Sequence, residues 1–339
     1  MNIFLIMYCN RTAECLSRWL AIAALLGSMI AIASPRAHAA STSFLDYCLQ
    51  SYSEDPAISS TVDALIEAAD TSDCHDANRI LSDSTTLNLS NLQLQNIGPL
   101  ANFSQLTELN LEGNQISDLS PLSPLFNLQT LILNGNAVEV LQPLSGLTQL
   151  THLELAQNNV SDLQPLQSLT QLTILGLGGN QISDLAPLVP LTHLQRLQLT
   201  NNQIVEVSAV FELMQLTALF LDGNVIPDGD RLLIEQTVNR RRLTLIQACQ
   251  DCNLANLDLS NTDLIGANLQ GANLSGANLD GADLVRADLS SANLRDANLN
   301  NADLEAACLN DADLTNSSQV NTNLQGATMP DERSALCNY

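Results

Sequence analysis

The chain has 339 residues, a formal net charge of −24 and an aromatic fraction of only 3%. This length has room for two domains, and the scarcity of aromatic residues argues against a conventional core built around Phe and Trp. All 12 basic residues are Arg. So negative a chain repels nucleic acid and anionic membranes, and it favours basic partners or divalent cations.

The N-terminal segment has the pattern of a secretory signal peptide. Arg11 and Arg18 precede an apolar run over residues 19–32, which leads to Ala37-His38-Ala39. This pattern predicts cleavage after Ala39, so that residues 1–39 are removed. A membrane anchor is the alternative, but the run falls short of the roughly 20 residues that a span needs. We therefore expect an exported protein without stable membrane insertion.

Six cysteines remain after cleavage, an even number that suits disulfides in an exported chain. Proximity in the sequence favours three pairs, Cys48–Cys74, Cys249–Cys252 and Cys308–Cys337. About 15 pairings are possible for six cysteines, so the connectivity stays open. The C-x-x-C spacing of the middle pair also leaves open redox-active thiols or a metal site, although zinc would need a second pair of ligands.

A leucine pattern returns every 22 residues from Leu106 to Gln215. In its clearest unit, residues 106–127, Leu109 and Leu111 alternate with polar residues, which predicts a short strand with one buried face. An asparagine recurs at one position, where burial would require it to bond neighbouring backbone groups: Asn114, Asn136, Asn158, Asn180, Asn202 and Asn224. Prolines recur on the return path, outside the strands: Pro99, Pro121, Pro143, Pro165 and Pro187.

This pattern resembles the 22-residue leucine-rich repeats of the internalin and phosphatase-regulator type. The resemblance implies a solenoid over residues 84–227, a curved horseshoe whose concave side carries a parallel sheet and binds other proteins. It also implies a helical N-terminal cap over residues 40–83. Within that cap, the spacing of apolar residues predicts a short helix over residues 61–69.

Residues between the strand leucines form two columns that face out of the concave sheet. Three of them are apolar, and Gly176 and Gly178 would leave a shallow floor between them. Exposed apolar groups with a polar rim often mark partner sites, although scattered apolar residues are common on surfaces. The predicted partner-binding site comprises Ile132, His152, Glu154, Ile174, Arg196 and Phe220.

Residues 228–248 follow neither repeat and predict a capping helix and linker. Within residues 228–239 we expect Leu232 and Leu233 to face inward. The only basic cluster, residues 240–242, has three arginines, too few for a nucleic-acid patch. We expect these arginines to pair with local carboxylates or with the carbonyls at a helix C-terminus.

A leucine returns at every fifth residue from Leu254 to Leu314. Ala267 and Leu269, two residues apart on a strand, point to one face. This register resembles the pentapeptide-repeat family, which implies a right-handed quadrilateral parallel β-helix over residues 249–330, with four pentapeptides per coil and a tail over 331–339. Outward aspartates would form an acidic wall: Asp263, Asp283, Asp288, Asp303 and Asp313. Some family members are acidic DNA mimics, but the export signal and the four short coils argue against that function.

The sequence therefore predicts a mostly β protein made of two solenoids, without enzymatic activity, cofactor or metal. Its histidines are dispersed, and no phosphate loop, nucleophile elbow or paired catalytic carboxylates occur. The favoured function is an exported scaffold that binds an unidentified protein on the leucine-rich arc. The alternative is an architectural spacer of the envelope or lumen. Because pentapeptide repeats are plentiful in cyanobacteria, the thylakoid lumen joins the periplasm and the exterior as a destination.

Overall fold

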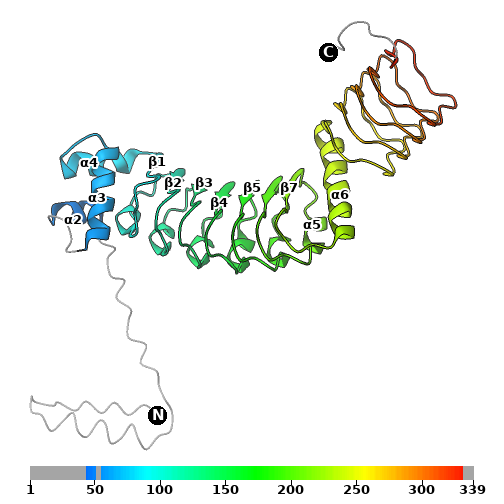
Figure 1. Cartoon of the computed structure of the whole chain (residues 1–339). Helices are drawn as coiled ribbons and strands as arrows, with labels where there is room; N and C mark the ends of the chain where they lie inside the picture. The colour runs from blue at the N-terminus through cyan, green and yellow to red at the C-terminus, as the bar shows by residue number, and fades with distance from the viewer. Residues whose placement is uncertain (1–42, 51–54, 331–339) are drawn as a thin grey trace, which may run out of the picture. The chain divides into compact units, whose positions relative to one another are not determined.

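A computed structural model describes residues 43–50 and 55–330 (Figure 1). The predicted signal peptide, residues 1–39, and the C-terminal tail, residues 331–339, lie outside the described residues. Among the residues described, no helix is both long and apolar enough to cross a bilayer.

Three helices form the N-terminal cap: α2 (Phe44–Leu49), α3 (Pro56–Ala68) and α4 (Cys74–Asp83). The helix expected over residues 61–69 is the C-terminal part of α3. It begins five residues earlier because Asp55 accepts a hydrogen bond from the N–H of Ala57 at 2.9 Å and Pro56 occupies the first turn.

The cap is closed by the Cys48–Cys74 disulfide, one of the predicted pairs, which joins α2 to the start of α4. Phe44 and Leu65 are fully buried in the core that continues into the repeats. Since the disulfide closes a loop of 26 residues, it contributes about 3 kcal/mol in the chain-entropy account.

Seven three-residue strands follow and pair in parallel, in sequence order and exact 22-residue register. They are β1 (Thr86–Asn88), β2 (Glu108–Asn110), β3 (Thr130–Ile132), β4 (His152–Glu154), β5 (Ile174–Gly176), β6 (Arg196–Gln198) and β7 (Ala218–Phe220). Each central leucine points into the core. Leu219 of the last strand is only half-buried, whereas the six central leucines before it are buried.

The return path of each repeat is a short helical turn that contains the predicted proline. These turns are η1 (Gly98–Leu100), η2 (Ser120–Leu122), η3 (Gln142–Leu144), η4 (Gln164–Ser168) and η5 (Ala186–Leu188). The next repeat lacks the proline and forms an α-helical turn instead, α5 (Ser208–Glu212).

The recurrent asparagine forms a ladder inside the turn that follows each strand. In Asn158, Nδ2 donates to the carbonyls of Leu133 and Leu155 at 2.9 and 3.0 Å, and Oδ1 accepts from the N–H of Val138 at 2.9 Å. The other five repeat the pattern. Each amide therefore ties its own repeat to the one before it, which satisfies a buried polar group at every turn.

Helix α6 (Asp228–Ile246) lies between the two arrays and contributes to both cores. Ile234 and Val238 pack in the leucine-rich core, whereas Leu243 packs in the core of the second array. The prediction that Leu232 and Leu233 face inward is wrong, since both are about half exposed. The helix runs seven residues beyond the expected end at residue 239, and this length brings Leu243 to the second core.

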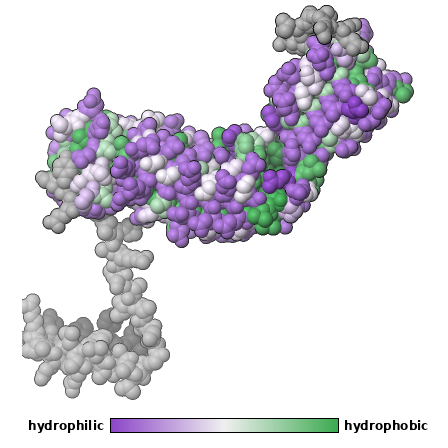
Figure 2. Space-filling model, viewed as in Figure 1, coloured by the Kyte–Doolittle hydropathy of each residue, from purple (hydrophilic) through white to green (hydrophobic). Residues whose placement is uncertain are grey.

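The arginine cluster holds α6 against the repeats. Arg241 donates to the carbonyls of Val210, Phe211 and Leu213 at 2.7 to 3.2 Å, around the C-terminal end of α5. This contact confirms for Arg241 the prediction that the cluster pairs with the carbonyls at a helix C-terminus. Burial lowers the pKa of Arg241. The drawn face of the molecule is mostly hydrophilic, with apolar colour near α5 and α6 (Figure 2).

The second array is a β-helix whose coils bridge residues 20 positions apart, from Ala248–Asn268 to Cys308–Thr328. Four pentapeptides therefore form one coil, as predicted. The interior consists mainly of the alanine and leucine columns, which are almost completely buried from Ala267 to Leu309. Chain corners adopt positive φ, for example +67° at Gly276, where a Cβ would overlap the amide of Asn256 in the coil before.

Candidate binding surface

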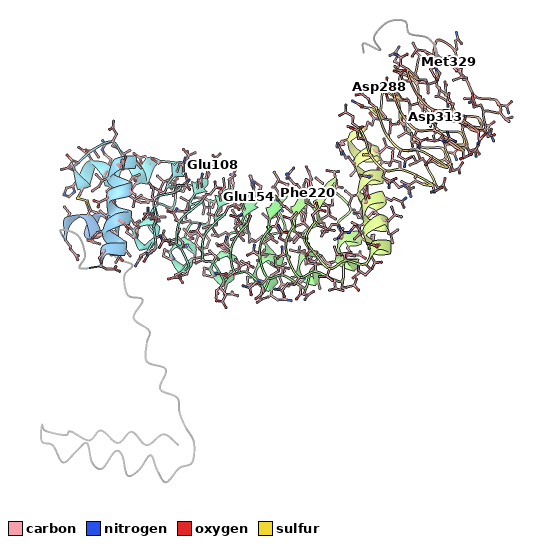
Figure 3. All side chains as sticks on the ribbon, viewed as in Figure 1. Glu108, Glu154, Phe220, Asp288, Asp313 and Met329 are labelled. Atoms are coloured by element: carbon pink, nitrogen blue, oxygen red, sulfur yellow. A yellow bond between two sulfur atoms is a disulfide. The ribbon has the colours of Figure 1, made fainter. Side chains whose placement is uncertain are left out.

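The exposed side of the leucine-rich sheet presents two columns of side chains, one from the first and one from the third residue of each strand. Figure 3 labels Glu108, Glu154 and Phe220 on this side. The parallel register places equivalent side chains of successive strands about 4.8 Å apart. The first column comprises Thr86, Glu108, Thr130, His152, Ile174, Arg196 and Ala218, and the second comprises Asn88, Asn110, Ile132, Glu154, Gly176, Gln198 and Phe220.

At the centre of the sheet, His152 and Glu154 pair within one strand. Their Nε2 and Oε1 atoms lie 3.1 Å apart. The carboxylate of Glu154 extends over β5, where a Cβ on Gly176 would overlap it. The expected shallow floor at Gly176 is therefore covered by a side chain, and the prediction of an open floor is wrong. Glycine at residue 176 is what lets the carboxylate lie flat on the sheet.

Toward the C-terminal end of the sheet, the guanidinium of Arg196 lies over the ring of Phe220, 4.8 Å from its centroid. This is a cation–π contact, and it holds Phe220 with 38% of its surface exposed. Ile174 is half-buried on the strand between His152 and Arg196. Five of the six predicted residues thus lie on four adjacent strands as two contacting pairs and one isoleucine.

Ile132 belongs to a different part of the surface. It lines a pocket of 260 Å³ over β1 to β3, with Asn88, Glu108 and Asn110 among the other lining residues. These polar residues occupy the same outward columns but are not among the predicted site residues. The outward column position was the signal that could have found them. Besides Ile132, the central leucines of β1 and β2 give the pocket an apolar lining.

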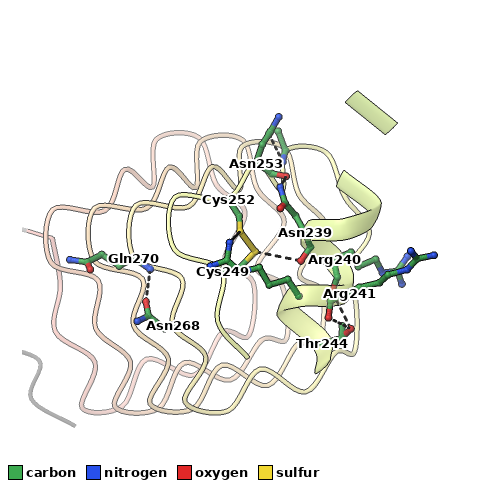
Figure 4. Close-up of a disulfide and its surroundings, with 11 residues drawn as sticks. Asn239, Arg240, Arg241, Thr244, Cys249, Cys252, Asn253, Asn268 and Gln270 are labelled. Atoms are coloured by element: carbon green, nitrogen blue, oxygen red, sulfur yellow. Dashed lines mark hydrogen bonds between the residues drawn. A yellow bond between two sulfur atoms is a disulfide. The ribbon is translucent and has the colours of Figure 1, made fainter. Parts of the chain in front are cut away.

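In the described ranges, no three His, Cys, Asp or Glu side chains come together in a way that could hold a metal ion. Cys249 and Cys252 form the predicted disulfide, with the sulfur of Cys249 3.4 Å from the carbonyl of Asn239 (Figure 4). Cys308 is disulfide-bonded as well, and Cys337, its expected partner, lies outside the described residues.

The aspartates of the β-helix do not form the single acidic wall that we expected. Coil pairing stacks Asp263, Asp283 and Asp303 on one wall, and it places Asp288 and Asp313 on two others. Figure 3 labels the latter two. The reason is the four-sided cross-section, which returns to one wall only at every fourth pentapeptide.

Most wall side chains are also engaged in local structure. The Oδ1 atom of the central Asn or Asp accepts a hydrogen bond from the N–H two residues later, as Asp283 does from Val285 at 3.2 Å. Asp313 accepts in this way from Thr315 and pairs with Arg295 at 3.1 Å. These bonds build the corners of the coils. The outward carboxylates therefore have a structural role that the sequence pattern alone did not reveal.

Comparison with family models identifies two kinds of repeat in this chain. A model of leucine-rich repeats matches residues 85–124, 127–168, 148–190 and 170–210. A model of pentapeptide repeats matches residues 249–284 and 282–318. Both agree with the resemblances noted in the sequence. A search of curated proteins finds no match.

Solved structures of similar proteins fall into the same two groups. Internalin C2 from Listeria monocytogenes is 30% identical, with 52% of this chain and 88% of that chain covered and a TM-score of 0.43. The internalin inlF from the same organism is 18% identical, with 80% and 91% covered and a TM-score of 0.46. A pentapeptide repeat protein from the Arabidopsis thaliana thylakoid lumen is 38% identical, with 24% and 54% covered and a TM-score of 0.23.

Proposed function

We propose that this protein, a leucine-rich-repeat protein fused to a pentapeptide-repeat domain, is an exported, non-enzymatic scaffold that binds a protein partner on its concave sheet. The observation that carries the proposal is the contrast between two sets of outward side chains. In the β-helix they build the corners of the coils. In the concave columns Asn88 and Asn110 have a similar role in the turns after their strands, whereas the side chains from β3 to β7 that form the predicted site contact only one another.

The concave surface offers a partner both apolar area and fixed charges. Ile174 and Phe220 are partly exposed, so a partner that covers them gains apolar burial. Glu154 and Arg196 are held by His152 and by the Phe220 ring, so little side-chain entropy is lost when they contact a partner. Preorganised charges next to apolar anchors set the orientation of a bound protein.

The experiment is capture of partners from an extract by the immobilised mature chain. A double variant, Ile174→Ala with Phe220→Ala, removes both anchors and should abolish capture, since buried anchors commonly contribute about 1–2 kcal/mol or more each. The matched control is Asp283→Asn with Asp288→Asn, which keeps an acceptor oxygen at each wall position. Circular dichroism should show that both variants stay folded.

Two outcomes would move the function elsewhere. Capture lost only with the aspartate variant would assign binding to the walls of the β-helix. A capture profile that survives charged substitutions at both Ile132 and Phe220 would favour an architectural spacer with no specific ligand on this sheet.

Export is a separate part of the proposal and rests on the sequence from Arg11 to Ala39. Mature protein recovered from cells should begin at Ala40 or within a residue or two of it, which N-terminal sequencing would measure. Recovery of the full-length chain from the cytoplasm would refute export. If export is observed, fractionation of cells that carry a tagged chain would distinguish among periplasm, thylakoid lumen and exterior.

A further inference from the structure

The last strand of the leucine-rich sheet ends in backbone groups that every earlier strand uses. Strand β6 bonds forward to the next repeat through the carbonyl of Gln195, at 2.9 Å, and the N–H groups of Leu199 and Asn201, at 2.8 and 2.7 Å. The 22-residue repeat makes the equivalent groups of the last repeat the carbonyl of Thr217 and the N–H groups of Leu221 and Gly223. Over the described part of the chain, none of these three groups has a hydrogen-bond partner.

A groove runs along this edge rather than a packed wall. Its volume is 240 Å³, and it is lined on one side by residues 219–222 and on the other by α6. Figure 1 shows β7 and α6 next to each other at this end of the sheet. The α6 side is a single helix face, with spacings of three and four residues: Arg231, Ile234, Glu235, Val238 and Asn239.

The backbone groups and side chains of the groove are complementary to an extended polypeptide. The unpartnered groups all belong to odd-numbered residues, which face the same side of an extended strand: Leu221 and Gly223 are about 6.6 Å apart, and Thr217 lies about 13 Å before Leu221. A neighbouring strand presents its own N–H and C=O groups at multiples of about 6.6 Å. Ile234 and Val238 line the groove but are only 3% and 7% exposed, because they pack in the leucine-rich core. An added strand would therefore meet backbone partners on the β7 side and the face of α6 on the other side.

The rim of the groove favours a basic segment. Asp222 has 88% of its side chain exposed and lies 3.6 Å from Arg231, and Glu235 is exposed one turn further along α6. Asp228 and Asp230 in the first turn of the helix add negative charge. Two carboxylates against one guanidinium line the groove itself, in a chain of net charge −24.

We propose that a lysine-containing, extended segment of a partner protein binds in this groove as an eighth strand of the sheet. Its backbone pairs with Thr217, Leu221 and Gly223, its apolar side chains face Ile234 and Val238, and its lysines meet Asp222 and Glu235. This site shares Phe220 with the concave columns, but it otherwise uses the edge of the sheet and a face of α6.

The test uses the mature chain and an acetylated peptide of alternating valine and lysine, about seven residues long, which spans the ~20 Å from residue 217 to 223. Binding is measured by fluorescence anisotropy, and amide hydrogen exchange is measured by NMR. Bound peptide should slow exchange at Leu221 and Gly223 at least about tenfold, because their N–H groups gain partners. Amides that are already paired, such as Leu199, should not change.

Backbone pairing is separated from charge attraction by two isomers of the peptide, N-methylated either on the valines or on the lysines. Since only alternate residues face β7, one isomer should lose at least about tenfold in affinity, equal to ~1.4 kcal/mol, and the other should lose much less. Glu235→Lys should weaken binding of the unmodified peptide. Glu112→Lys, an exposed position equivalent to Asp222 five repeats earlier, is the matched control and should not.

Three results would overturn the proposal. They are absence of peptide binding, equal affinity of the two N-methylated isomers, and binding without slower exchange at Leu221 and Gly223. Peptide-induced changes confined to residues such as His152 and Ile174 would instead place the peptide on the concave face. That last result would leave the proposed function standing while refuting the edge site.

Discussion

Both repeat arrays have a core that extends in one direction, but their ladders of polar side chains lie in different places, inside one array and outside the other. In the leucine-rich array the amide ladder lies inside, at Asn158 and its equivalents, and the outward side chains of β3 to β7 form no such ladder. In the β-helix the interior is mostly alanine and leucine, and the amides and carboxylates lie on the walls. There, Asn298 donates to Asn278 in the coil before, at 2.9 Å.

This difference explains which surface can vary. A wall residue of the β-helix accepts a hydrogen bond that builds a corner, so Asn and Asp recur at nearly every central position. On the leucine-rich sheet Asn88 and Asn110 accept such a bond, whereas the columns from β3 to β7 contain charged, apolar and aromatic side chains. Side chains that differ from repeat to repeat, with no role in the fold, are expected on a surface that recognises a partner.

The largest effect should come from the β-helix interior. Leu289 is completely buried, and Leu289→Asp would place an unpaired carboxylate there, at a cost of more than about 4 kcal/mol. Denaturant unfolding should show the β-helix melting separately from the leucine-rich array. A single transition that shifts as a whole would instead mean that α6 couples the two arrays completely.

A smaller but still large loss is expected from the internal ladder. Asn158→Ala leaves the N–H of Val138 without its partner and removes one of the two amide donors to the carbonyls of Leu133 and Leu155, which should cost about 2 kcal/mol. Asn298→Ala on a β-helix wall, exposed to water, should cost about 1 kcal/mol or less. Equal losses by denaturant unfolding would contradict the distinction between inner and outer ladders.

A gain of stability is expected where the outer ladder lacks a donor. Asp263, Asp283 and Asp303 stack on one wall without an amide between them, whereas Asn323 donates to Asp303 at 2.9 Å. Asp283→Asn supplies a donor and removes a like charge, so it should stabilise the β-helix by about 0.5–1 kcal/mol. Asp313→Asn, which weakens the pair with Arg295, should instead destabilise slightly in the same thermal melts.

The smallest effect concerns acid. The backbone N–H groups of Asp76 and His75 lower the pKa of Asp73 below its usual 3.8, and the hydroxyl and N–H of Thr315 do the same for Asp313. A lowered carboxyl pKa stabilises the fold above 3.8, and this contribution is lost as pH falls through the lowered value. Amides 75 and 76 should therefore exchange faster in that range. Asp73→Ala should remove this pH dependence, and its persistence would contradict the assignment.

Both folds could be predicted from periodicity because each repeat buries the same residues in every unit. Boundaries were harder where a single residue decides them. The start of α3 depends on Asp55 and Pro56, and the end of α6 depends on packing of Leu243 against an array that the helix pattern does not contain. Leu232 and Leu233 were assigned inward on hydrophobicity alone, although Ile234 and Val238, spaced by four, fill that position.

The sequence predicts the positions of the residues on the candidate surface but not the contacts between their side chains. Alternation along a strand places residues in columns, so the register of Ile174, Arg196 and Phe220 followed from the sequence. The pairing of Glu154 with His152 across the bare backbone of Gly176 required coordinates, because side-chain direction is not fixed by spacing. The division of the aspartates among walls needed the four-sided geometry of the coil.

Helix α6 limits where the chain could be divided between its two repeat arrays, because it packs against both of them. Gln236 and Asn239 donate to the carbonyls of Ala255 and Asn253 in the first coil, while Arg241 donates to the end of the leucine-rich array. A break within residues 228–246 would leave one of the two arrays without the helix that covers the end of its core. Neither array keeps its complete core without α6, because residues of this helix pack in both cores.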